Sequence, residues 1–473
     1  MTQDSTAATK RRPAFPLALR RALPGLVLLA VAVRVLVPVR DPDTFWHLRA
    51  GDFLRQTWSF AGPEPWSPAS SRPWVLHEWL PELVLSIVQQ WLGLPGVAWL
   101  LPLGATAALL AVWASCRDRA PILVSAVVAT VTFVAMAGSM SLRPQLVTFA
   151  LTAVTVRAWL RTAEDRRPRG WLVPLTWLWA CTHGMWFVGL VVAGTVIAGM
   201  ALDRSLSWRQ GRQLALVPAL SLVAAALTPV GPGLLLAPLT VRGYTRFVTE
   251  WAAPSLSDGF FLAFLALAAV PVLLWARGGT AVPWTRLLLL AAGTGMALLY
   301  VRTVPLGAAV VAPVTAEALA RASRLRREDV SPRETRATAV LAAVGLAIAA
   351  VLAPTVAAHP GRGPAGLDVA LDALATGTVV CNDYTDGGWL LWRHPQLRPV
   401  IDGRTEVYSV DHVERYTDFV AARPGWQAFP QRTGCTHALL PDGSPVLESL
   451  RAQEHWTQVA RADGSTLLRS PSS

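Results

Sequence analysis

Residues 40–82 read RDPDTFWHLRAGDFLRQTWSFAGPEPWSPASSRPWVLHEWLPE, and this stretch follows directly on the first long apolar segment of the chain. It gathers carboxylates, histidines and tryptophans in a sequence that is otherwise rich in Leu, Ala and Val. Charged side chains are costly to place in a bilayer, so membrane proteins keep them where they have partners or a function. We therefore expect the fold to be arranged around this acidic and aromatic stretch.

The composition indicates the class of protein. Of the 473 residues, 53% are hydrophobic and 15% are charged, whereas soluble domains carry about 25% charged residues. Apolar runs of membrane-crossing length recur along the chain, and the loops between them are short. These features predict an all-α polytopic membrane bundle, in the cell membrane and in contact with membrane lipids.

The net charge of +12 is unevenly distributed. Residues 1–356 contain 32 Lys and Arg against 17 Asp and Glu, whereas residues 357–473 contain 10 against 13. Short cytoplasmic loops of membrane proteins collect Arg and Lys, and the positive excess lies in such loops here. Nucleic-acid binding is the other common cause of a high pI, and this distribution argues against it.

Hydropathy and loop charge together predict about eleven spans, with the N-terminus inside and the C-terminus outside. The chain then divides into a basic cytoplasmic N-terminus (residues 1–21), a transmembrane domain (22–356) with an outer loop at 40–92, and a C-terminal domain (357–473). Within the outer loop, residues 74–91 suggest a helix at the membrane interface. The expected spans are residues 22–39, 96–115, 120–137, 146–160, 171–182, 186–202, 214–227, 260–275, 287–300, a tenth after Pro305, and 337–356.

The C-terminal domain has a different pattern from the rest of the chain. GTVVCN, RPVIDGR and HALLP read as short buried strands, ALDALATG and DGGWLLWR as helical pieces, and the last segment as a hairpin with an Asp-Gly turn. We expect a small extracytoplasmic α/β domain. Because we place this domain outside the cell membrane, a disulfide between Cys381 and Cys435 is plausible.

Three polar residues at the start of the outer loop are candidates for chemistry. Asp41 and Asp43 flank a proline that keeps the segment extended, so their side chains project to the same side. His47 follows Asp43 by one helical turn. The group is suited to supply a general base, and carboxylates with imidazole also suit Mg²⁺ or Mn²⁺. The alternative is a capped loop helix whose acids pair with neighbouring arginines, and the spacing does not decide between these interpretations.

Four arginines lie beside spans on the expected outer face, where the orientation rule disfavours positive charge. Guanidinium groups match phosphate oxygens bidentately, so the set could clamp a phosphate. For one arginine at the end of a span, snorkelling to lipid headgroups is the better explanation. Several arginines beside an acidic loop favour the phosphate. They are Arg143, Arg242, Arg246 and Arg302.

Further polar residues on the same face are assigned supporting roles. His77 and Glu78 belong to the outer loop and accompany His47. His183 stands between two short spans, where a single histidine is more often structural than catalytic. Glu250 follows Arg246 by four residues, so an ion pair between them would be structural. The tryptophans are mostly an interfacial belt, and those of the outer loop are also suited to stack on sugar rings.

These motifs resemble a family of bacterial polytopic membrane proteins assigned to the GT-C type of glycosyltransferase. The resemblance covers nearly the whole chain, and its one departure is Phe45, where the family more often has Trp. The matching residues are Asp41-Pro-Asp43-Thr-Phe-Trp46-His47-Leu48-Arg49-Ala50-Gly51, Pro73-Trp74-Val-Leu-His77-Glu78-Trp79-Leu80, Arg143-Pro144-Gln145, His183-Gly184, Thr228-Pro229, Glu250-Trp251, Arg302 ahead of Pro305, residues 382–392 and residues 401–404.

The resemblance implies a hexosyl- or pentosyltransferase that takes its sugar from a polyprenyl-phosphate donor at the outer leaflet. The acceptor would be an envelope glycan, lipid or protein. Asp43 is then the first candidate for the base and Asp41 the second, whereas Arg143, Arg302 and Arg246 would bind the donor phosphate. No cofactor is implied with certainty; if a metal takes part, we expect Mg²⁺ or Mn²⁺.

The resemblance also implies that the C-terminal domain selects or covers the acceptor. The residues expected nearest the contact surface are Asp383, Tyr384, Asp402 and Arg404.

Two other functions compete with the transferase. A transporter or flippase of lipid-linked sugars would show charged residues near mid-span and helix breaks at matched positions of two repeats. In this sequence the polar residues lie at the outer ends of the spans, and no repeat is visible. The other competitor is a non-catalytic scaffold of the cell envelope, and mutation of Asp43 would distinguish it from an enzyme.

Overall fold

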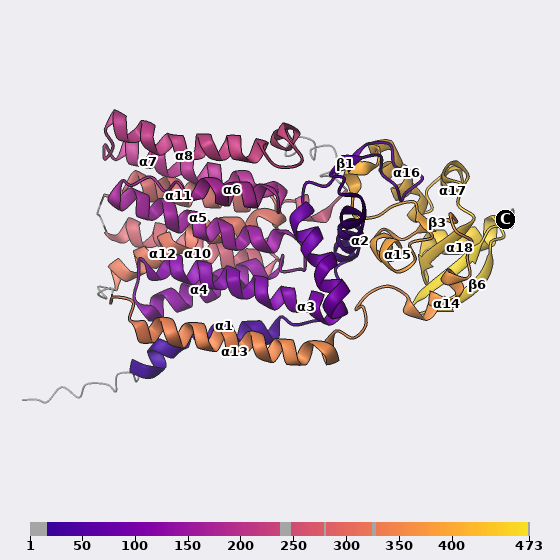
Figure 1. The fold of residues 1–473 in the computed structure, drawn as a ribbon, viewed down its shortest axis with the longest axis horizontal. Coiled ribbons are helices and arrows are strands. Elements are labelled where there is room, and N and C mark those ends of the chain that lie inside the picture. Colours follow the sequence, from indigo (N-terminus) through magenta and orange to yellow (C-terminus); the bar gives the residue numbers. More distant parts are fainter. Residues whose placement is uncertain (1–16, 237–246, 279–280, 324–327, 472–473) are drawn as a thin grey trace, which may run out of the picture.

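The computed structural model describes residues 17–236, 247–278, 281–323 and 328–471. These residues form a bundle of long helices with a smaller sheet-containing domain at one end (Figure 1). We call this end of the bundle the domain end. The predicted combination of a helical membrane bundle and a C-terminal α/β domain is therefore present.

Each of the eleven expected spans coincides with a helix of the bundle. Gly93, with a φ of 62°, divides the longest of these helices, so the expected interface helix is the first part of α3. The helices are α1 (Leu17–Arg34), α3 (Trp79–Arg117), α4 (Ile122–Ala137), α5 (Gln145–Asp165), α6 (Leu172–Ala180), α7 (Val188–Leu202), α8 (Trp208–Ala226), α10 (Gly259–Gly278), α11 (Trp284–Leu299), α12 (Val304–Ala322) and α13 (Pro332–Val356).

Within the described residues, five helical segments are long and apolar enough to cross a membrane. The helices α4 and α11 are apolar but shorter. The chain is therefore a multi-pass membrane protein, whereas the count of eleven spans and their orientation stay predictions. The five segments are Trp79–Arg117, Gly184–Leu202, Gly259–Gly278, Val301–Ala322 and Pro332–Val356.

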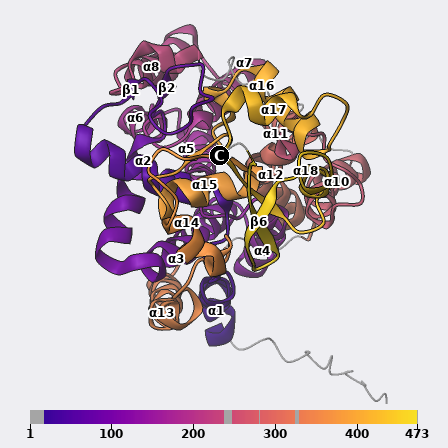
Figure 2. The ribbon, with the colours of Figure 1, turned by 90° about the vertical axis from the view of Figure 1, so that its right-hand side faces the viewer.

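The helix α12 forms the centre of the bundle. The most apolar 18-residue stretch of α12 is 83% buried inside the protein, whereas that of α13 at the periphery is 22% buried. Small residues allow the close packing, because a side chain on Gly307 would overlap the carbonyl oxygen of Gly293 on α11. At the edge of the bundle, α1 and α13 lie side by side (Figures 1 and 2). Small residues thus let α12 pack closely, and large apolar side chains such as Phe149, Trp159 and Phe264 fill other parts of the core.

A short helix, α2 (Pro42–Thr57), lies at the domain end between the bundle and the sheet-containing domain (Figure 1). The side chain of Asp41 caps it by accepting a hydrogen bond from the backbone N–H of Asp43 at 3.0 Å. Gly51 brings α2 against α3, since a Cβ there would collide with the backbone of Glu82. The acidic start of the loop is thereby fixed in place by both a cap and a helix contact.

The C-terminal domain contains a five-stranded sheet in the order β4-β3-β5-β7-β6. β3 runs parallel to β4 and β5, whereas β5, β7 and β6 are antiparallel. The turn between β6 and β7 is the expected Asp463-Gly464 pair. The elements are β3 (Val379–Asn382), β4 (Arg398–Pro399), β5 (His437–Pro441), β6 (Thr457–Ala462), β7 (Ser465–Arg469), α14 (Asp368–Asp372), α15 (Tyr384–Arg393), α16 (Val410–Val420), α17 (Ala428–Thr433) and α18 (Pro445–Gln453).

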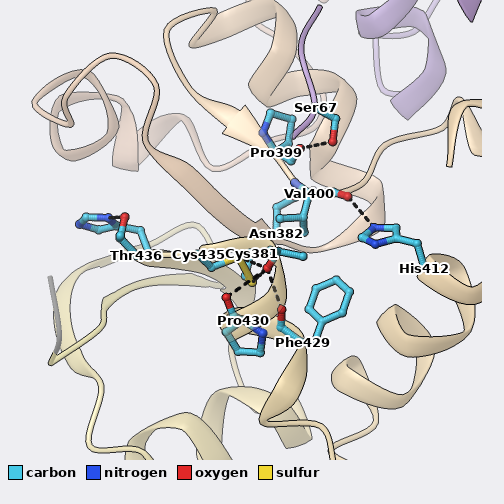
Figure 3. The surroundings of a disulfide bond; sticks show 12 residues. Ser67, Cys381, Asn382, Pro399, Val400, His412, Phe429, Pro430, Cys435 and Thr436 are labelled. Carbon is cyan, nitrogen blue, oxygen red and sulfur yellow. Dashed lines mark hydrogen bonds between the residues drawn. A yellow bond between two sulfur atoms is a disulfide. The ribbon is translucent and has the colours of Figure 1, made fainter. Parts of the chain in front are cut away.

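The structure joins Cys381 and Cys435 in a disulfide, with their Cα atoms 5.6 Å apart (Figure 3). The bond links β3 to the residues just before β5, the strand beside it. Cys116 and Cys181 are buried as free thiols.

The outer loop packs against this domain. It forms a small hairpin from β1 (Ala61–Gly62) and β2 (Trp74–Val75). Between these strands, Ser67 donates a hydrogen bond from its Oγ to the carbonyl of Pro399 at 2.9 Å (Figure 3). The loop and the domain therefore pack as one unit, although more than 300 residues separate them in sequence.

A buried arginine holds this unit together. Arg404 donates from Nη1 to Glu64 of the loop at 2.8 Å and from Nη2 to Asp402 at 2.7 Å. Its guanidinium also lies over the rings of Trp66 and Trp74, 4.5 and 5.1 Å from their centroids. All three charged side chains are fully buried.

We expect Arg404→Leu to destabilise the protein by about 3–5 kcal/mol, because it leaves two buried carboxylates without a counterion. Thermal unfolding in detergent, followed by intrinsic fluorescence, measures the loss. The matched control is Arg415→Leu, which removes an exposed ion pair to Asp411 on α16 and should cost less than about 1 kcal/mol. Equal effects of the two substitutions would contradict the anchoring role.

Candidate active site

The acid pair of the loop converges on one arginine. Arg143, in the turn before α5, donates from Nε to Asp41 at 2.8 Å. Its Nη1 lies 3.2 Å from Asp43 Oδ2 and 2.7 Å from Glu250 Oε1. Asp41 and Asp43 of the outer loop and the distant Glu250 share this single guanidinium. The structure thus brings together three acids and an arginine that the sequence predicted for one face.

A second arginine, Arg302, lies next to this cluster, and not all of its N–H groups donate a hydrogen bond within the described residues. Its Nη1 is 3.7 Å from Glu250 Oε2, and its Nη2 is 3.4 Å from His183 Nε2. The guanidinium also lies over the ring of Trp251, 5.5 Å from the centroid. Its Nε is buried without a hydrogen-bond partner in the described residues. An anionic ligand could satisfy that group.

Three imidazoles surround the carboxylate of Glu78. The distances from Glu78 oxygens to the Nε2 atoms of His183, His77 and His47 are 3.6, 3.7 and 3.8 Å. Burial lowers the pKa of both His47 and His183, so both are neutral imidazoles near pH 7. Glu78 and its histidines therefore form a polar support that His183 connects to Arg302, and their supporting role in the reaction stays a prediction.

Sequence reasoning missed two residues of this support. Glu82 Oε1 lies 3.1 Å from His47 Nδ1, and Thr148 Oγ1 lies 2.9 Å from His183 Nδ1. Glu82 follows Glu78 by four residues at the start of α3, so the helical period could have placed them on one face. Thr148 carries no such signal, because threonine is common in membrane helices.

Asp43 occupies a confined position. Burial raises its pKa to about 6, while Arg143 opposes this shift and Asp41 adds to it. A Cβ on Gly403 would overlap the Asp43 carboxylate, and one on Gly388 would overlap the backbone of the same turn. The C-terminal domain thus covers Asp43 closely through two glycines, and this burial holds the pKa of its carboxyl group above the usual range for an aspartate.

In the described cluster, the carboxylates outnumber the arginines. Asp41, Asp43 and Glu250 face Arg143 and Arg302, which leaves one negative charge when all five groups are ionised. Protonation of Asp43 would make the cluster neutral. The arginine Arg246, and its neighbour Arg242, lie outside the described residues, so their expected part in phosphate binding has no structural description.

The expected metal set does not assemble. Asp41 and Asp43 face the guanidinium of Arg143, whereas the His47 ring faces Glu78 and Glu82. Nowhere in the described ranges do three or more His, Cys, Asp or Glu side chains take up positions suited to a metal ion. A guanidinium already lies between the two aspartates, so this donor set does not fit Mg²⁺ or Mn²⁺ in the arrangement described.

The four residues expected on the acceptor side fall into different environments. Asp402 and Arg404 are fully buried, and their polar atoms bond to one another, to Glu64 and to Tyr408. They hold the domain together and cannot contact an acceptor, which corrects their expected role. Asp383 caps α15 by accepting from Thr385 N at 2.9 Å. Tyr384 is half-buried; burial raises the pKa of its phenol, and the charge of Asp43 adds to this shift.

We expect Arg143→Gln to destabilise the protein by about 2 kcal/mol at pH 8, because three partly buried carboxylates lose their shared counterion. In the variant the pKa of Asp43 rises further above its unfolded value, so the folded state binds protons more readily and the loss shrinks at pH 5. Thermal unfolding at both pH values measures this. Arg302→Gln is the matched control, since its nearest carboxylate contact is 3.7 Å, and it should cost less at either pH.

Comparison with known proteins identifies the fold. No described family and no curated protein matches the sequence. Among solved structures, the chain is similar to the oligosaccharyltransferase AglB of Archaeoglobus fulgidus in complex with an inhibitory peptide and a dolichol-phosphate, with a TM-score of 0.61 and 11% identity over 89% of this chain and 69% of that chain.

The apo form of the same oligosaccharyltransferase superposes with a TM-score of 0.58 and 11% identity, over 91% of this chain and 70% of that chain. ArnT from Cupriavidus metallidurans bound to undecaprenyl phosphate gives a TM-score of 0.44 and 12% identity, over 95% and 97% of the two chains. The chain thus has a fold similar to that of the oligosaccharyltransferase AglB, at a sequence identity that shows the fold alone.

Proposed function

We propose that the protein is a membrane glycosyltransferase that moves a sugar from a polyprenyl-phosphate donor to an envelope glycan, lipid or protein. The observation that carries this proposal is the placement of Asp43, a carboxyl group with a pKa of about 6, beside Arg143 and near Arg302 at one end of a membrane bundle. A base and a phosphate-binding cation at a membrane edge are what sugar transfer from a lipid phosphate needs.

In the proposed reaction, a hydroxyl oxygen of the acceptor attacks the anomeric carbon of the donor sugar. The new bond to the acceptor oxygen forms as the bond between the anomeric carbon and the phosphate oxygen breaks. The hydroxyl proton passes to the ionised carboxylate of Asp43, and the polyprenyl phosphate leaves with the electron pair of the broken bond. Asp41 and Arg143 hold Asp43 in position for this proton transfer.

Arg302 is the better candidate for the donor phosphate. The bonds of Arg143 go to three carboxylates of the protein itself, whereas the Arg302 Nε has no described partner. The phosphate leaving group needs positive charge more than it needs a proton. The dolichol-phosphate bound by the structurally similar AglB belongs to the same class of lipid as the proposed donor.

The proposed orientation places the domain end at the outer leaflet. Basic short loops on the opposite side support it, because cytoplasmic loops collect arginine. The disulfide between Cys381 and Cys435 also favours an oxidising compartment for the C-terminal domain. Whether the sugar is a hexose or a pentose does not follow from these features.

Asp43→Asn should lower the rate of sugar transfer by about 10²–10⁴-fold, because an amide cannot accept the hydroxyl proton. The assay uses the purified chain in lipid nanodiscs with radiolabelled polyprenyl-phosphate sugars and cell-envelope extract as acceptor. The matched control is Asp52→Asn on the same helix, which should keep the activity. Full activity of the Asn variant would exclude Asp43 as the base, whereas no transfer by the wild type would favour the scaffold or flippase over the enzyme.

The wild-type rate should also depend on pH through Asp43. The base works when ionised, so kcat/KM should fall about tenfold per pH unit well below pH 6 and level off above about pH 7. Initial rates between pH 5 and 8 measure the profile. A flat profile through pH 6 would exclude Asp43 as the base.

Arg302→Gln should raise KM for the donor and lower kcat, since the phosphate is bound in the ground state and gains charge in the transition state. The comparison of donor KM and kcat with the wild type measures both effects. Arg302→Lys keeps the charge and should restore part of the activity. A variant with unchanged donor kinetics would place the phosphate elsewhere.

A further inference from the structure

Two cavities lie near the start of α2 and share the residues Arg40 and Arg362, and Asp41 lines one of them. The first, of about 310 Å³, lies between the segment that follows α1, the helix α3 and the turn before α5. Its walls are mostly apolar, and they include Val37, Ala98 and Leu142. We call it the apolar cavity.

The second cavity, of about 430 Å³, is formed mainly by the C-terminal domain. Its walls carry hydroxyl and carboxylate groups from Thr385, Asp386, Asp463 and Ser465. We call it the polar cavity. An apolar compartment and a polar one therefore meet at two arginines.

The local backbone explains why the two arginines lie together. The segment after α13 runs along the segment after α1, and Gly361 N donates to the carbonyl of Val39 at 2.8 Å. A Cβ on Gly361 would come within 2.9 Å of Pro38, so the close approach depends on the missing side chain. This contact brings Arg40 and Arg362 to the same place.

These arginines differ from those of the acid cluster. Both Arg40 and Arg362 are exposed, and neither lies within 4 Å of a carboxylate of the described residues. By contrast, Arg143 has three acidic partners. The charge of Arg362 acts on Asp386 from beyond ion-pair distance. Two exposed guanidinium groups between an apolar and a polar compartment match a lipid with a phosphate between its chains and its headgroup.

We propose that the two cavities bind the acceptor, and that the acceptor is a phospholipid with a polyhydroxylated headgroup. The hydrocarbon chains occupy the apolar cavity, Arg40 and Arg362 bind the phosphate, and the headgroup hydroxyls bond to Asp386, Asp463 and the neighbouring hydroxyls. The proposal rests on the proposed glycosyltransferase function and names its acceptor class.

The position of Asp41 assigns this site to the acceptor rather than to the donor. Asp41 and Pro42 line the apolar cavity, whereas Arg302 and Glu250 line neither cavity. Arg40 lines both cavities and directly precedes Asp41, so a lipid phosphate at Arg40 would place the neighbouring headgroup hydroxyls on the Arg40 side of the acid pair. The donor phosphate would lie at Arg302. The ion pair of Asp41 with Arg143 lies between this position and the lipid site at Arg40.

Lipid binding to the full-length protein in detergent tests this proposal. The probes are dioctanoyl phosphatidylinositol, dioctanoyl phosphatidylcholine, undecaprenyl phosphate and inorganic phosphate, each titrated by microscale thermophoresis. We expect phosphatidylinositol to bind at least tenfold more tightly than phosphatidylcholine. The double variant Arg40→Gln/Arg362→Gln should lose that preference, while its affinity for undecaprenyl phosphate stays the same.

Two further variants sharpen the test. Met140→Trp fills part of the apolar cavity without removing a charge, and it should weaken phosphatidylinositol binding as well. Arg432→Gln removes an exposed arginine that lines neither cavity, and it should leave binding unchanged. Because Arg40 and Arg362 are exposed, their replacement should not disturb folding, and unfolding temperatures verify this.

Several results would overturn the proposal. Unchanged phosphatidylinositol binding by the double variant would show that the arginines hold no lipid. Loss of undecaprenyl phosphate binding instead would assign the cavities to the donor. Competition by inorganic phosphate at the same concentration as the lipid would show a site for a free anion.

The binding test is also independent of the sugar-transfer assay. Arginine-dependent phosphatidylinositol binding without any sugar transfer by the wild type would support the lipid site and contradict the glycosyltransferase.

Discussion

The shared ion pair of Arg143 is the interaction on which the arrangement of the site depends. This guanidinium contacts Asp41 and Asp43 of the outer loop and Glu250 of a distant segment, so it joins three parts of the chain. None of the three acids has another cation as near to it in the described residues; Arg302 is 3.7 Å from Glu250. The start of α2, the turn before α5 and the segment around Glu250 are therefore fixed relative to one another by one side chain.

The C-terminal domain is held against the start of α2 and the outer loop by close steric contacts and by a buried ion pair. Steric contact at Gly388 and Gly403 presses it against the start of α2, and Arg404 ties it to the outer loop. Larger side chains at either glycine would displace the domain from Asp43. The domain is thus part of the wall of the site, and its closeness accounts for the burial that raises the pKa of Asp43.

Much of this site could be predicted from the sequence because membrane topology restricts which residues can meet. Hydropathy and loop charge placed Asp41 and Arg143 on one face, although they are 102 residues apart. Topology gives no atomic contacts, however. It did not reveal that Asp402 and Arg404 are buried by a loop more than 300 residues earlier, nor that Thr148 supports His183. Those contacts depend on how helices rotate against each other, which short motifs do not encode.

The excess of acid in the cluster has a consequence for the proposed chemistry. With three carboxylates against two arginines, the described cluster is already negative when Asp43 is ionised. A donor phosphate at Arg302 adds negative charge nearby and raises the proton affinity of Asp43 further. In the proposed reaction, an ionised Asp43 would therefore be a stronger base when the donor is bound. A binding order in which the donor precedes the acceptor would use this coupling, because the pKa of Asp43 would then already be raised when the acceptor hydroxyl binds.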